Sequence, residues 1–538
     1  MLAGVLGLTM DYQLTVPALL RRAETLHGAR EVVSRQPDGS IARTTYGAVA
    51  VRARKLAVAL QQLGIARGDR VATFGWNHGE HLEAYFGVPA LGGVLHTLNV
   101  RLHADELAYI ATHAGDRAVI VDAALLPALE EFRDRAPFEH VIVVSGAAPA
   151  GTIAYEELLA AADEAAYVEP ELDEREAAAC CYTSGTTGAP KGVLYSHRCL
   201  VLHTLSVATV DSLAIAEREV VLPVVPMFHA NAWGLPYAAA MAGAKLVLPA
   251  ARLDPASLLE LLASERVTIS AGVPTVYLAL LQALDAAPGA HDLGALHTLV
   301  IGGSAAPQAL IEGFQHRHGI AVLHAWGMTE LAPIGTIGRL PAALAGASEA
   351  ERLRYRSRQG RPVPFVELRA RGDAGLIPWD GSAYGELEVR GPTVASAYTD
   401  GDGADKFTAD GWFSTGDIVT IDPDGTIELQ DRAKDLIKSG GEWISSVALE
   451  NALMGHAAVA EAAVVAVPDE RWGERPLAVV VLRDGATATA TADELRAHLE
   501  PGFARWWLPD EFVFADVIPK TATGKFKKTA LRDLYRRP

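Results

Sequence analysis

The segment Tyr182–Gly192 reads YTSGTTGAPKG, in which Gly, Ser and Thr crowd together before a single lysine. It stands between two apolar runs that are typical of buried strands, Ala177–Tyr182 (AAACCY) and Gly192–Tyr195, so the chain must turn through polar residues between two core elements. Such a turn can wrap backbone N–H groups, hydroxyls and an ammonium around phosphate oxygens. A flexible linker is the alternative, but linkers seldom join two apolar strands. Nucleotide chemistry is therefore the first hypothesis.

The spacing within this segment differs from that of P-loop kinases and GTPases. Lys191 follows Gly188 by three positions and precedes Gly192, whereas the P-loop motif has Ser or Thr directly after its lysine. We therefore do not expect a P-loop enzyme.

Composition limits the remaining possibilities. At 538 residues, half of them hydrophobic, the chain is long enough to divide into a large region and a smaller one. Its formal net charge of −18 and pI near 5.4 disfavour non-specific binding to nucleic acid or anionic lipid, because both need a basic surface. The three cysteines suit neither a disulfide framework nor a metal site. Without a cationic leader, or the ~18-residue apolar run of a transmembrane segment, we expect a soluble protein of the cytoplasm.

Two patterns of predicted secondary structure follow one another along the first 430 residues. Over Thr45–Leu340, helical patterns alternate with β-rich runs, which predicts α/β layers around a mainly parallel sheet. These runs are Val71–Phe74, Ala118–Val121, His140–Val144, Lys245–Leu248 and His297–Ile301. Over Phe365–Leu429, short strands such as Gly385–Arg390 and Thr426–Gln430 are separated by Gly, Pro and Asp, which predicts a more antiparallel, β-rich subdomain.

A second, smaller pattern follows the charge cluster Asp431–Lys438 (DRAKDLIK). We expect there two helices and three strands, at Val447–Met454, Ala462–Val467, Ala478–Leu482, Ala492–Leu499 and Phe512–Phe514. The predicted organisation is a large N-terminal region of residues 1–430, a hinge over residues 431–438 at Lys434, and a small mobile C-terminal α+β domain of residues 439–538.

The run Thr183–Gly192 fits [ST]-[ST]-G-[ST]-T-G-x-P-K-G at every position. In this it resembles the phosphate loop of the adenylate-forming (AMP-binding) superfamily, which includes acyl-CoA synthetases, luciferases and peptide-synthetase adenylation domains. The resemblance implies that superfamily's fold, with ATP, Mg²⁺ and coenzyme A as reactants. It also implies catalytic roles for Thr183 and Lys191, a metal contact for Thr183, and phosphate contacts for Ser184, Gly185, Thr186, Thr187 and Gly188.

The segment His324–Glu330 (HAWGMTE) resembles the superfamily's aromatic-G-x-T-E motif. The resemblance implies that the Trp326 ring covers adenine, that Thr329 touches the α-phosphate and that Glu330 helps to bind Mg²⁺ and catalyse the reaction. Tyrosine is frequent where Trp326 stands; stacking survives that change, although the hydroxyl is lost. The remaining implied nucleotide contacts of this segment are His324, Ala325, Gly327 and Met328.

Two further segments resemble nucleotide contacts of the family. Val300–Pro307 (VIGGSAAP) reads as a strand ending in a glycine pair, which lets backbone pass close to a flat ligand. It resembles the adenine-edge segment, so Gly303, Ser304 and Ala305 are implied to line adenine. Asp417, in STGD, corresponds to the ribose clamp, and a carboxylate has two oxygens with which to accept both ribose hydroxyls.

The charged run DRAKDLIK also fits the family pattern. Arg432 corresponds to an arginine that contacts ribose or phosphate, and Lys434 to the pivot residue two positions later. Lys438 is predicted to add a phosphate contact, with a solvated charge run as the alternative.

The C-terminal segment Pro519–Lys525 (PKTATGK) fits P-[RK]-[ST]-x-[ST]-G-K. In the superfamily this lysine bridges the acyl carboxylate and the α-phosphate, so Lys525 is implied to be the principal catalyst of adenylation. The segment Ser439–Ser446 (SGGEWISS) is implied to face the site during thioester formation, where it flanks the pantetheine passage through Gly440, Gly441, Glu442 and Trp443. Because the two half-reactions need two faces of the small domain, we expect it to rotate between them.

The acyl side is predicted from Val224–Tyr237 (VVPMFHANAWGLPY), which resembles fatty acyl-CoA synthetases. Peptide-synthetase domains have an aspartate where this chain has His229, so no anionic partner for an amino-acid substrate is expected. Trp233 is predicted to gate an apolar tunnel that includes Val273 and Thr275; an ordinary core tryptophan is the alternative. GGEWISSVALENALMGH and ERPLAVVV resemble bacterial medium- and long-chain fatty acyl-CoA ligases and 3-methylthiopropionyl-CoA ligases.

The resemblance thus implies an AMP-forming acid–thiol ligase that converts a medium- or long-chain fatty acid to acyl-AMP and then to acyl-CoA. Four alternatives stay open: a short thioether or aryl acid as substrate, acyl transfer to a carrier protein, luciferase-type oxidation, and a catalytically silent acyl- or nucleotide-binding protein. Related enzymes are often homodimers.

Overall fold

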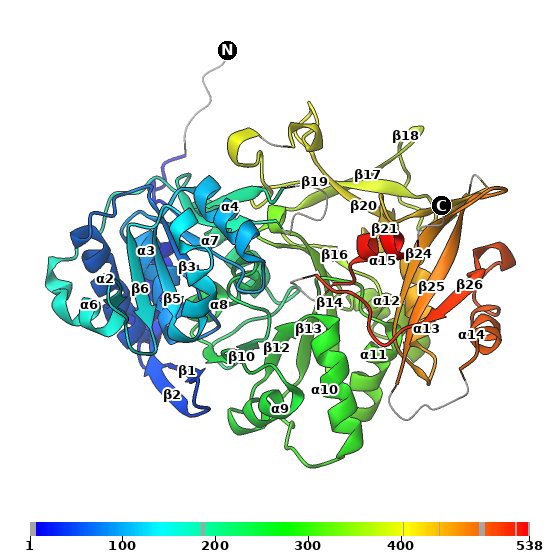
Figure 1. The fold of residues 1–538 in the computed structure, drawn as a ribbon, viewed down its shortest axis with the longest axis horizontal. Coiled ribbons are helices and arrows are strands. Elements are labelled where there is room, and N and C mark those ends of the chain that lie inside the picture. The colour runs from blue at the N-terminus through cyan, green and yellow to red at the C-terminus, as the bar shows by residue number, and fades with distance from the viewer. Residues whose placement is uncertain are drawn as a thin grey trace.

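The structure is a computed structural model that describes residues 7–183, 189–401, 403–440, 442–483, 490–521 and 525–535. It confirms the predicted α/β class: two mainly parallel sheets are followed by an antiparallel subdomain and a small C-terminal α+β unit. In Figure 1 the first sheet (blue through cyan; β3, β5 and β6 are labelled) and the C-terminal unit (orange to red) lie at opposite ends of the molecule. Within the described ranges, no helix combines the length and apolar character that crossing a membrane requires.

The first sheet has seven strands in the order β7-β6-β5-β3-β4-β8-β9. All neighbours are parallel except β8 and β9, which form an antiparallel pair. The strands are β3 (Arg70–Phe74), β4 (Val94–Thr97), β5 (Asp116–Asp122), β6 (His140–Val144), β7 (Ile153–Ala154), β8 (Ala177–Tyr182) and β9 (Gly192–Ser196). Its helices include α2 (Tyr46–Gln62), α3 (Gly79–Ala90), α4 (Ala104–Ala114) and α6 (Tyr155–Ala161).

The second sheet has nine strands in the order β16-β15-β14-β13-β12-β10-β11-β1-β2. From β14 to β1 the neighbours are parallel, and these strands are largely continuous apolar runs, as expected for strands covered on both faces. The strands are β1 (Glu31–Arg35), β2 (Ile41–Thr45), β10 (Val220–Pro223), β11 (Lys245–Leu248), β12 (Ile269–Gly272), β13 (Thr298–Ile301), β14 (Ala321–Gly327), β15 (Ile334–Ile337) and β16 (Arg361–Pro362).

Helices join these two sheets into one core. They include α1 (Val16–His27), α7 (His197–Ala208), α8 (Leu235–Ala242), α9 (Pro255–Ser264), α10 (Pro274–Ala286), α11 (Gln308–Glu312) and α12 (Glu349–Arg356). In α3 every residue except Glu80 is buried, and the largest hydrophobic cluster contains residues from α1, α2, α3, α7, α8 and both sheets. The two sheets are therefore held as one body.

The antiparallel subdomain has the strand order β18-β17-β19-β20-β21. Its strands are β17 (Glu367–Gly372), β18 (Gly375–Leu376), β19 (Gly385–Arg390), β20 (Phe413–Ile421) and β21 (Ile427–Arg432). The long loop between β19 and β20 returns to the first sheet, where its single-turn element Thr399–Gly401 packs on β9.

The C-terminal unit has its own sheet, in which β23-β22-β25-β24 are antiparallel neighbours and β26 pairs in parallel with β25. Its elements are β22 (Ile437–Ser439), β23 (Glu442–Ile444), α13 (Ser446–Met454), β24 (Val459–Asp469), β25 (Gly473–Leu482), α14 (Ala492–Leu499), β26 (Glu511–Phe514) and α15 (Lys528–Leu534). Two hydrophobic clusters lie wholly within this unit. It therefore has a core of its own.

Candidate active site

The base of the predicted phosphate loop is the β8–β9 hairpin. Tyr182 and Gly192 pair across it, the Thr183 N–H donates to the Lys191 carbonyl at 2.9 Å, and the Lys191 N–H donates to Thr183 Oγ1 at 3.1 Å. These bonds hold Thr183 and Lys191 opposite each other where the strands end. The loop residues between them that the sequence singled out, Ser184, Gly185, Thr186, Thr187 and Gly188, lie outside the described residues.

Glu330 is held in the single-turn element Thr329–Leu331, directly after β14. Its side chain is buried, and Oε1 accepts a hydrogen bond from the Tyr398 hydroxyl at 2.5 Å. Burial raises the pKa of the Glu330 carboxyl, while the bond from Tyr398 opposes that change. The backbone of the turn is fixed as well, because the Tyr195 hydroxyl donates to the Thr329 carbonyl at 2.5 Å.

Three predicted nucleotide residues, from the end of β14, the middle of β20 and the end of β21, meet at one place. The indole Nε1 of Trp326 donates to Asp417 Oδ2 at 2.8 Å, and Arg432 Nε lies 2.7 Å from Asp417 Oδ1. Asp417 is almost fully buried, whereas the Arg432 side chain is 40% exposed. Both carboxylate oxygens are thus already in polar contact, so a ribose would share Asp417 with the indole and the guanidinium.

The glycine pair after β13 forms a close passage. Gly303 has φ +85°, and a side-chain carbon there would lie 3.3 Å from Val273 Cγ1, 3.9 Å from Lys525 Cε and 4.0 Å from Trp233 Cζ2. A neutral His324 buttresses the turn that follows: it accepts from the Ala306 N–H at 3.2 Å and donates to the Ser357 carbonyl at 3.0 Å. Burial lowers the pKa of His324 to about 4. Ser304 is exposed and Ala305 partly buried within the same turn.

Lys525 projects from the C-terminal unit into this region. Its Cε lies close to Gly303, as described above. Burial lowers the pKa of His229 to about 4, and the nearby Lys525 ammonium contributes to that decrease. Burial also lowers the pKa of Lys525 itself, to about 8. The charge of Arg432 lowers this pKa further, whereas the carboxylates of Asp417 and Glu330 raise it. The structure therefore brings the C-terminal lysine close to predicted nucleotide and acyl residues.

A left-handed turn carries the acyl-side residues that follow His229. Ala230, Asn231, Ala232 and Trp233 have φ values of 42°, 51°, 48° and 57°, and Gly234 has 74°. Left-handed backbone at successive non-glycine residues is strained, and such strain is concentrated at functional sites. The turn places the Trp233 ring against Gly302 and Gly303. Val273 caps helix α10 and Thr275 lies in its first turn.

The loop after β3, through Asn77, holds the segment that precedes this turn. Asn77 is buried; its amide donates to the carbonyls of Pro223 (2.9 Å) and Val225 (3.0 Å), and its Oδ1 accepts from the Met227 N–H at 2.7 Å. Asn77 lies outside the sequence motifs, so nothing in its local sequence indicates this role. The three bonds tie the first sheet to the segment that leads into His229.

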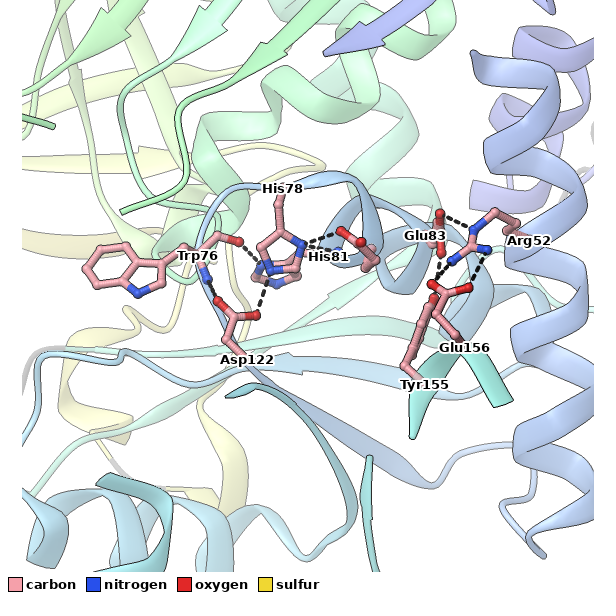
Figure 2. Close-up of polar contacts among 9 residues, drawn as sticks. Arg52, Trp76, His78, His81, Glu83, Asp122, Tyr155 and Glu156 are labelled. Carbon is pink, nitrogen blue, oxygen red and sulfur yellow. Dashed lines mark hydrogen bonds and ion pairs between the residues drawn. The ribbon is translucent and has the colours of Figure 1, made fainter. Parts of the chain in front are cut away.

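Figure 2 shows how the same loop is anchored. Asp122, at the end of β5, accepts from the Trp76 N–H at 2.9 Å and contacts His78 Nε2 at 2.6 Å, while His78 Nδ1 lies 3.0 Å from Glu80. Burial alone would lower the pKa of His78, but Asp122 and Glu80 outweigh it and raise the pKa to about 10. An imidazolium between two carboxylates therefore fixes the loop.

The hairpin β22–β23 makes its described contacts within the C-terminal unit. A side-chain carbon on Gly440 (φ +62°) would lie 2.8 Å from the Trp472 ring, and the Lys438 ammonium lies 4.3 Å from the centroid of the Trp443 ring. Glu442 is exposed on β23, and Gly441 is outside the described residues. Among the contacts found in the described ranges, those of Lys438, Gly440 and Trp443 are all within the C-terminal unit. The structure thus brings Lys525, but not this hairpin, to the predicted nucleotide and acyl residues.

Lys434 is exposed in the turn between β21 and β22. Arg532 of α15 donates to the Lys434 carbonyl at 3.1 Å and pairs with Asp435 at 2.7 Å. Ahead of the turn, Asp431 Oδ2 accepts from the Ser446 N–H at 2.8 Å. A cavity of about 650 Å³ separates α10 and α11 from the end of α13, so the C-terminal unit is not packed continuously against the large region.

Comparison with known proteins shows the family of this chain. Residues 19–399 match the family model described as AMP-binding enzyme, and residues 448–525 match the AMP-binding enzyme C-terminal domain. A long-chain-fatty-acid–CoA ligase of Thermus thermophilus is 51% identical (98% of this chain, 96% of the relative). A medium-chain-fatty-acid–CoA ligase of Ectopseudomonas oleovorans is 45% identical (99% and 98%), and a 3-methylmercaptopropionyl-CoA ligase of Ruegeria pomeroyi 44% (99% and 99%).

Solved structures show the same fold. An anthranilate CoA ligase, AuaEII, in complex with anthranoyl-AMP superposes with a TM-score of 0.86 at 26% identity (97% of this chain, 98% of that one). ATP-bound MatB from Rhodopseudomonas palustris gives 0.82 at 26% identity (98% and 99%). The chain belongs to the AMP-binding enzyme family, as its phosphate-loop motif predicted.

Proposed function

We propose that this protein is an ATP-dependent acyl-CoA synthetase that activates a fatty acid of medium or long chain. The observation that carries the proposal is the position of Lys525, which comes from the C-terminal unit and lies beside Gly303, His229 and the Asp417 site. Lys191 comes from the large N-terminal region, directly before β9 on the β8–β9 hairpin. Two parts of the chain thus each supply one of the two cations that the proposal needs.

This arrangement suits the first half-reaction. An oxygen of the acid's carboxylate attacks the α-phosphorus of ATP, and the bond to the bridging oxygen breaks, so that pyrophosphate leaves with that electron pair. Both reactants are anions, and their approach requires cations where charge accumulates. We assign Lys525 to the meeting point of carboxylate and α-phosphate, and Lys191 with the loop of residues 183–188 to the departing diphosphate.

The residues also suit a magnesium ion that arrives with ATP. Glu330 is a buried, oriented carboxylate beside the base of the phosphate loop, and Thr183 adds a hydroxyl. Among the described residues, no cluster of three or more His, Cys, Asp or Glu side chains could hold a metal by itself, which fits a cation bound mainly through phosphate oxygens and one carboxylate. Bound Mg²⁺ would supply neutralisation of the phosphate charge.

In the second half-reaction the thiolate sulfur of CoA attacks the acyl carbonyl, and AMP leaves. No enzyme nucleophile is needed. Cys181, although next to the phosphate loop, is buried, and burial raises the pKa of its thiol to about 11. We propose that the C-terminal unit rotates about Lys434, within the predicted hinge of residues 431–438, so that Gly440, Gly441, Glu442 and Trp443 replace Lys525 at the site.

For the nucleotide we propose the contacts that the family resemblance implies. Trp326 would stack on adenine, with Gly303, Ser304, Ala305 and the chain of residues 324–328 at its edge. Asp417 would bind ribose, and Thr329 and Arg432 would face phosphate. Lys438 would contact phosphate only after the C-terminal unit moves, because its ammonium now lies on Trp443.

For the acid, the names of the three relatives reported above point to fatty acids and to a short thioether acid. The strained turn at Trp233, closing on Gly302 and Gly303, supports an apolar pocket whose end is set by the indole. A 3-methylthiopropionate ligase is the second candidate, because one such relative is 44% identical over the whole chain. Three buried free thiols support a reducing, cytoplasmic setting.

The test is a panel of C2 to C18 straight-chain, aryl and thioether acids, with ATP and Mg²⁺, read by pyrophosphate and AMP release with and without CoA. We expect pyrophosphate with the preferred acid alone and acyl-CoA once CoA is added. Pyrophosphate release without thioester would indicate a carrier-protein ligase. No pyrophosphate with any acid would contradict the proposal and favour a binding protein.

A further inference from the structure

A residue outside every motif, Tyr398, lies between the two groups assigned to the diphosphate end of ATP. It is 8% exposed and stands in the loop between β19 and β20. Its hydroxyl donates to Glu330 Oε1 at 2.5 Å, and its ring face receives the Lys191 ammonium, with Nζ 5.1 Å from the ring centroid. One side chain therefore contacts an anion through its hydroxyl and a cation through its π face.

The cation side is enclosed by a glycine. Gly403 has φ +64°, and a side-chain carbon there would lie 2.6 Å from Lys191 Nζ and 3.0 Å from Tyr398 Cε2. Only a glycine leaves room for the ammonium between this backbone and the ring. A cation within about 6 Å of an aromatic centroid is attracted to the ring, so Lys191 is held without a carboxylate partner among the described residues.

The loop that bears Tyr398 is fastened on both sides of it. The Ala395 N–H donates to the Glu330 carbonyl at 2.7 Å. Asp400 pairs with His113 at 3.0 Å, and the other ring nitrogen of His113 contacts the Tyr182 hydroxyl at 2.7 Å. The loop is thus attached to the turn of Glu330 and to the base of the phosphate loop.

We propose that Tyr398 is a positioning residue for the magnesium–diphosphate end of ATP: it orients the Glu330 carboxylate and keeps the Lys191 ammonium from closing an ion pair with it. This inference rests on the function proposed above. A direct Lys191–Glu330 pair would neutralise the two charges against each other, and both would have to be separated before phosphate and metal could bind. The neutral Tyr398 side chain instead contacts Glu330 through its hydroxyl and Lys191 through its ring. Both charges therefore stay available for metal and phosphate.

Binding of ATP to the full-length protein in the absence of acid, measured at a series of Mg²⁺ concentrations, tests this role. Tyr398→Phe removes only the hydroxyl, and loss of one hydrogen bond to a charged group should weaken ATP binding and raise the half-saturating Mg²⁺ concentration by about tenfold. Tyr398→Leu also removes the ring face, and a larger loss is expected. Tyr355→Phe is the matched control, since Tyr355 is a buried tyrosine whose hydroxyl contacts Thr426, and its ATP binding should equal that of the wild type.

A double-mutant cycle asks whether Tyr398 acts through Glu330. In a Glu330→Gln background, Tyr398→Phe should cause no further loss of Mg²⁺-dependent ATP binding, because the effects of substituting two residues in direct contact do not add. Thioester formation from supplied acyl-AMP and CoA should be unchanged in Tyr398→Phe. An unchanged Mg²⁺ dependence, full additivity with Glu330→Gln, or an equal loss in Tyr355→Phe would each overturn the assignment.

The test also separates this inference from the proposed function. ATP binding needs no acid, so Tyr398→Phe gives a result even if the wild-type protein adenylates no acid in the panel. In that event the proposed function fails, while a raised Mg²⁺ requirement in the variant still supports the positioning role.

Discussion

Trp326 donates its indole N–H to Asp417 Oδ2 over 2.8 Å, so the residue expected to stack on adenine also orients the residue expected to bind ribose. A tyrosine, frequent at this position in the family, has its polar group at the ring's far end and would not present a donor at the same place. Tryptophan at this position therefore loses the tyrosine hydroxyl but gains a hydrogen bond to Asp417.

Replacing Trp326 with Phe keeps an aromatic face but removes the N–H. We expect the KM for ATP to rise by about tenfold, as for loss of a hydrogen bond to a charged group, with a smaller effect on kcat. Pyrophosphate release at varied ATP measures both constants. Trp412→Phe is a matched control, because its ring lies under Arg369 and Arg390, within the antiparallel subdomain. A wild-type KM in Trp326→Phe would show that the bond to Asp417 does not position ribose.

Lys525→Ala should separate the two half-reactions. Removing a positive charge from the point where carboxylate and α-phosphate meet should slow adenylation by about 10²-fold or more. Thioester formation from supplied acyl-AMP should be affected much less, since Lys525 is then proposed to lie outside the site. Single-turnover assays of each half-reaction distinguish these rates, and equal losses in both would refute the assignment of Lys525.

The pH dependence of adenylation follows from the same residue. The pKa of Lys525 is lowered to about 8, so its ammonium is present below that pH and is lost as the pH rises through it. We expect kcat/KM for ATP, which reports the free enzyme, to fall above about pH 8. Lys525→Arg should move this alkaline limb to higher pH, because a guanidinium stays charged. An alkaline limb near pH 8 that persists in the arginine variant would have to come from another group.

Lys434→Pro tests the hinge. Proline fixes φ near −65°, which restricts rotation about the backbone at the proposed pivot. Adenylation should continue in the arrangement described here, whereas thioester formation should fall at least about tenfold if rotation then limits that step. Lys434→Ala leaves the backbone free and should retain both half-reactions. Normal thioester formation in Lys434→Pro would place the pivot elsewhere.

The sequence predicted the fold better than it predicted the contacts at the site. Strands such as β6 and β11 are short apolar runs, and a parallel strand covered on both faces has that pattern regardless of its neighbours. The bonds of Tyr398 to Glu330 and of Trp326 to Asp417 join residues 68 and 91 positions apart, and neither partner's local sequence indicates the other.

The turn at Trp233 was unpredictable for a different reason. A left-handed conformation is normally signalled by glycine or asparagine, yet Ala230, Ala232 and Trp233 adopt it next to Asn231 and Gly234. Tertiary contacts must hold it there. Asn77 is the clearest of these, because its three hydrogen bonds fix the segment before the turn.

The loop that contains Asn77 depends in turn on the buried pair of His78 and Asp122 (Figure 2), and His78→Gln tests that dependence. The pKa of His78 rises from its ordinary value of 6.5 to about 10 in the folded protein. The charge therefore stabilises the fold fully below pH 6.5, and the contribution is lost as the pH rises from there toward 10.

Near pH 6.5 the variant should lose about 3 kcal/mol of unfolding free energy, the typical cost of removing one member of a buried ion pair. The difference from the wild type should narrow toward pH 10. Urea denaturation at several pH values measures it, with the exposed His316→Gln as control, since its pair with Glu349 is largely solvated. A deficit that is the same at every pH would mean that His78 supports the Asn77 loop by packing alone and that its charge contributes nothing.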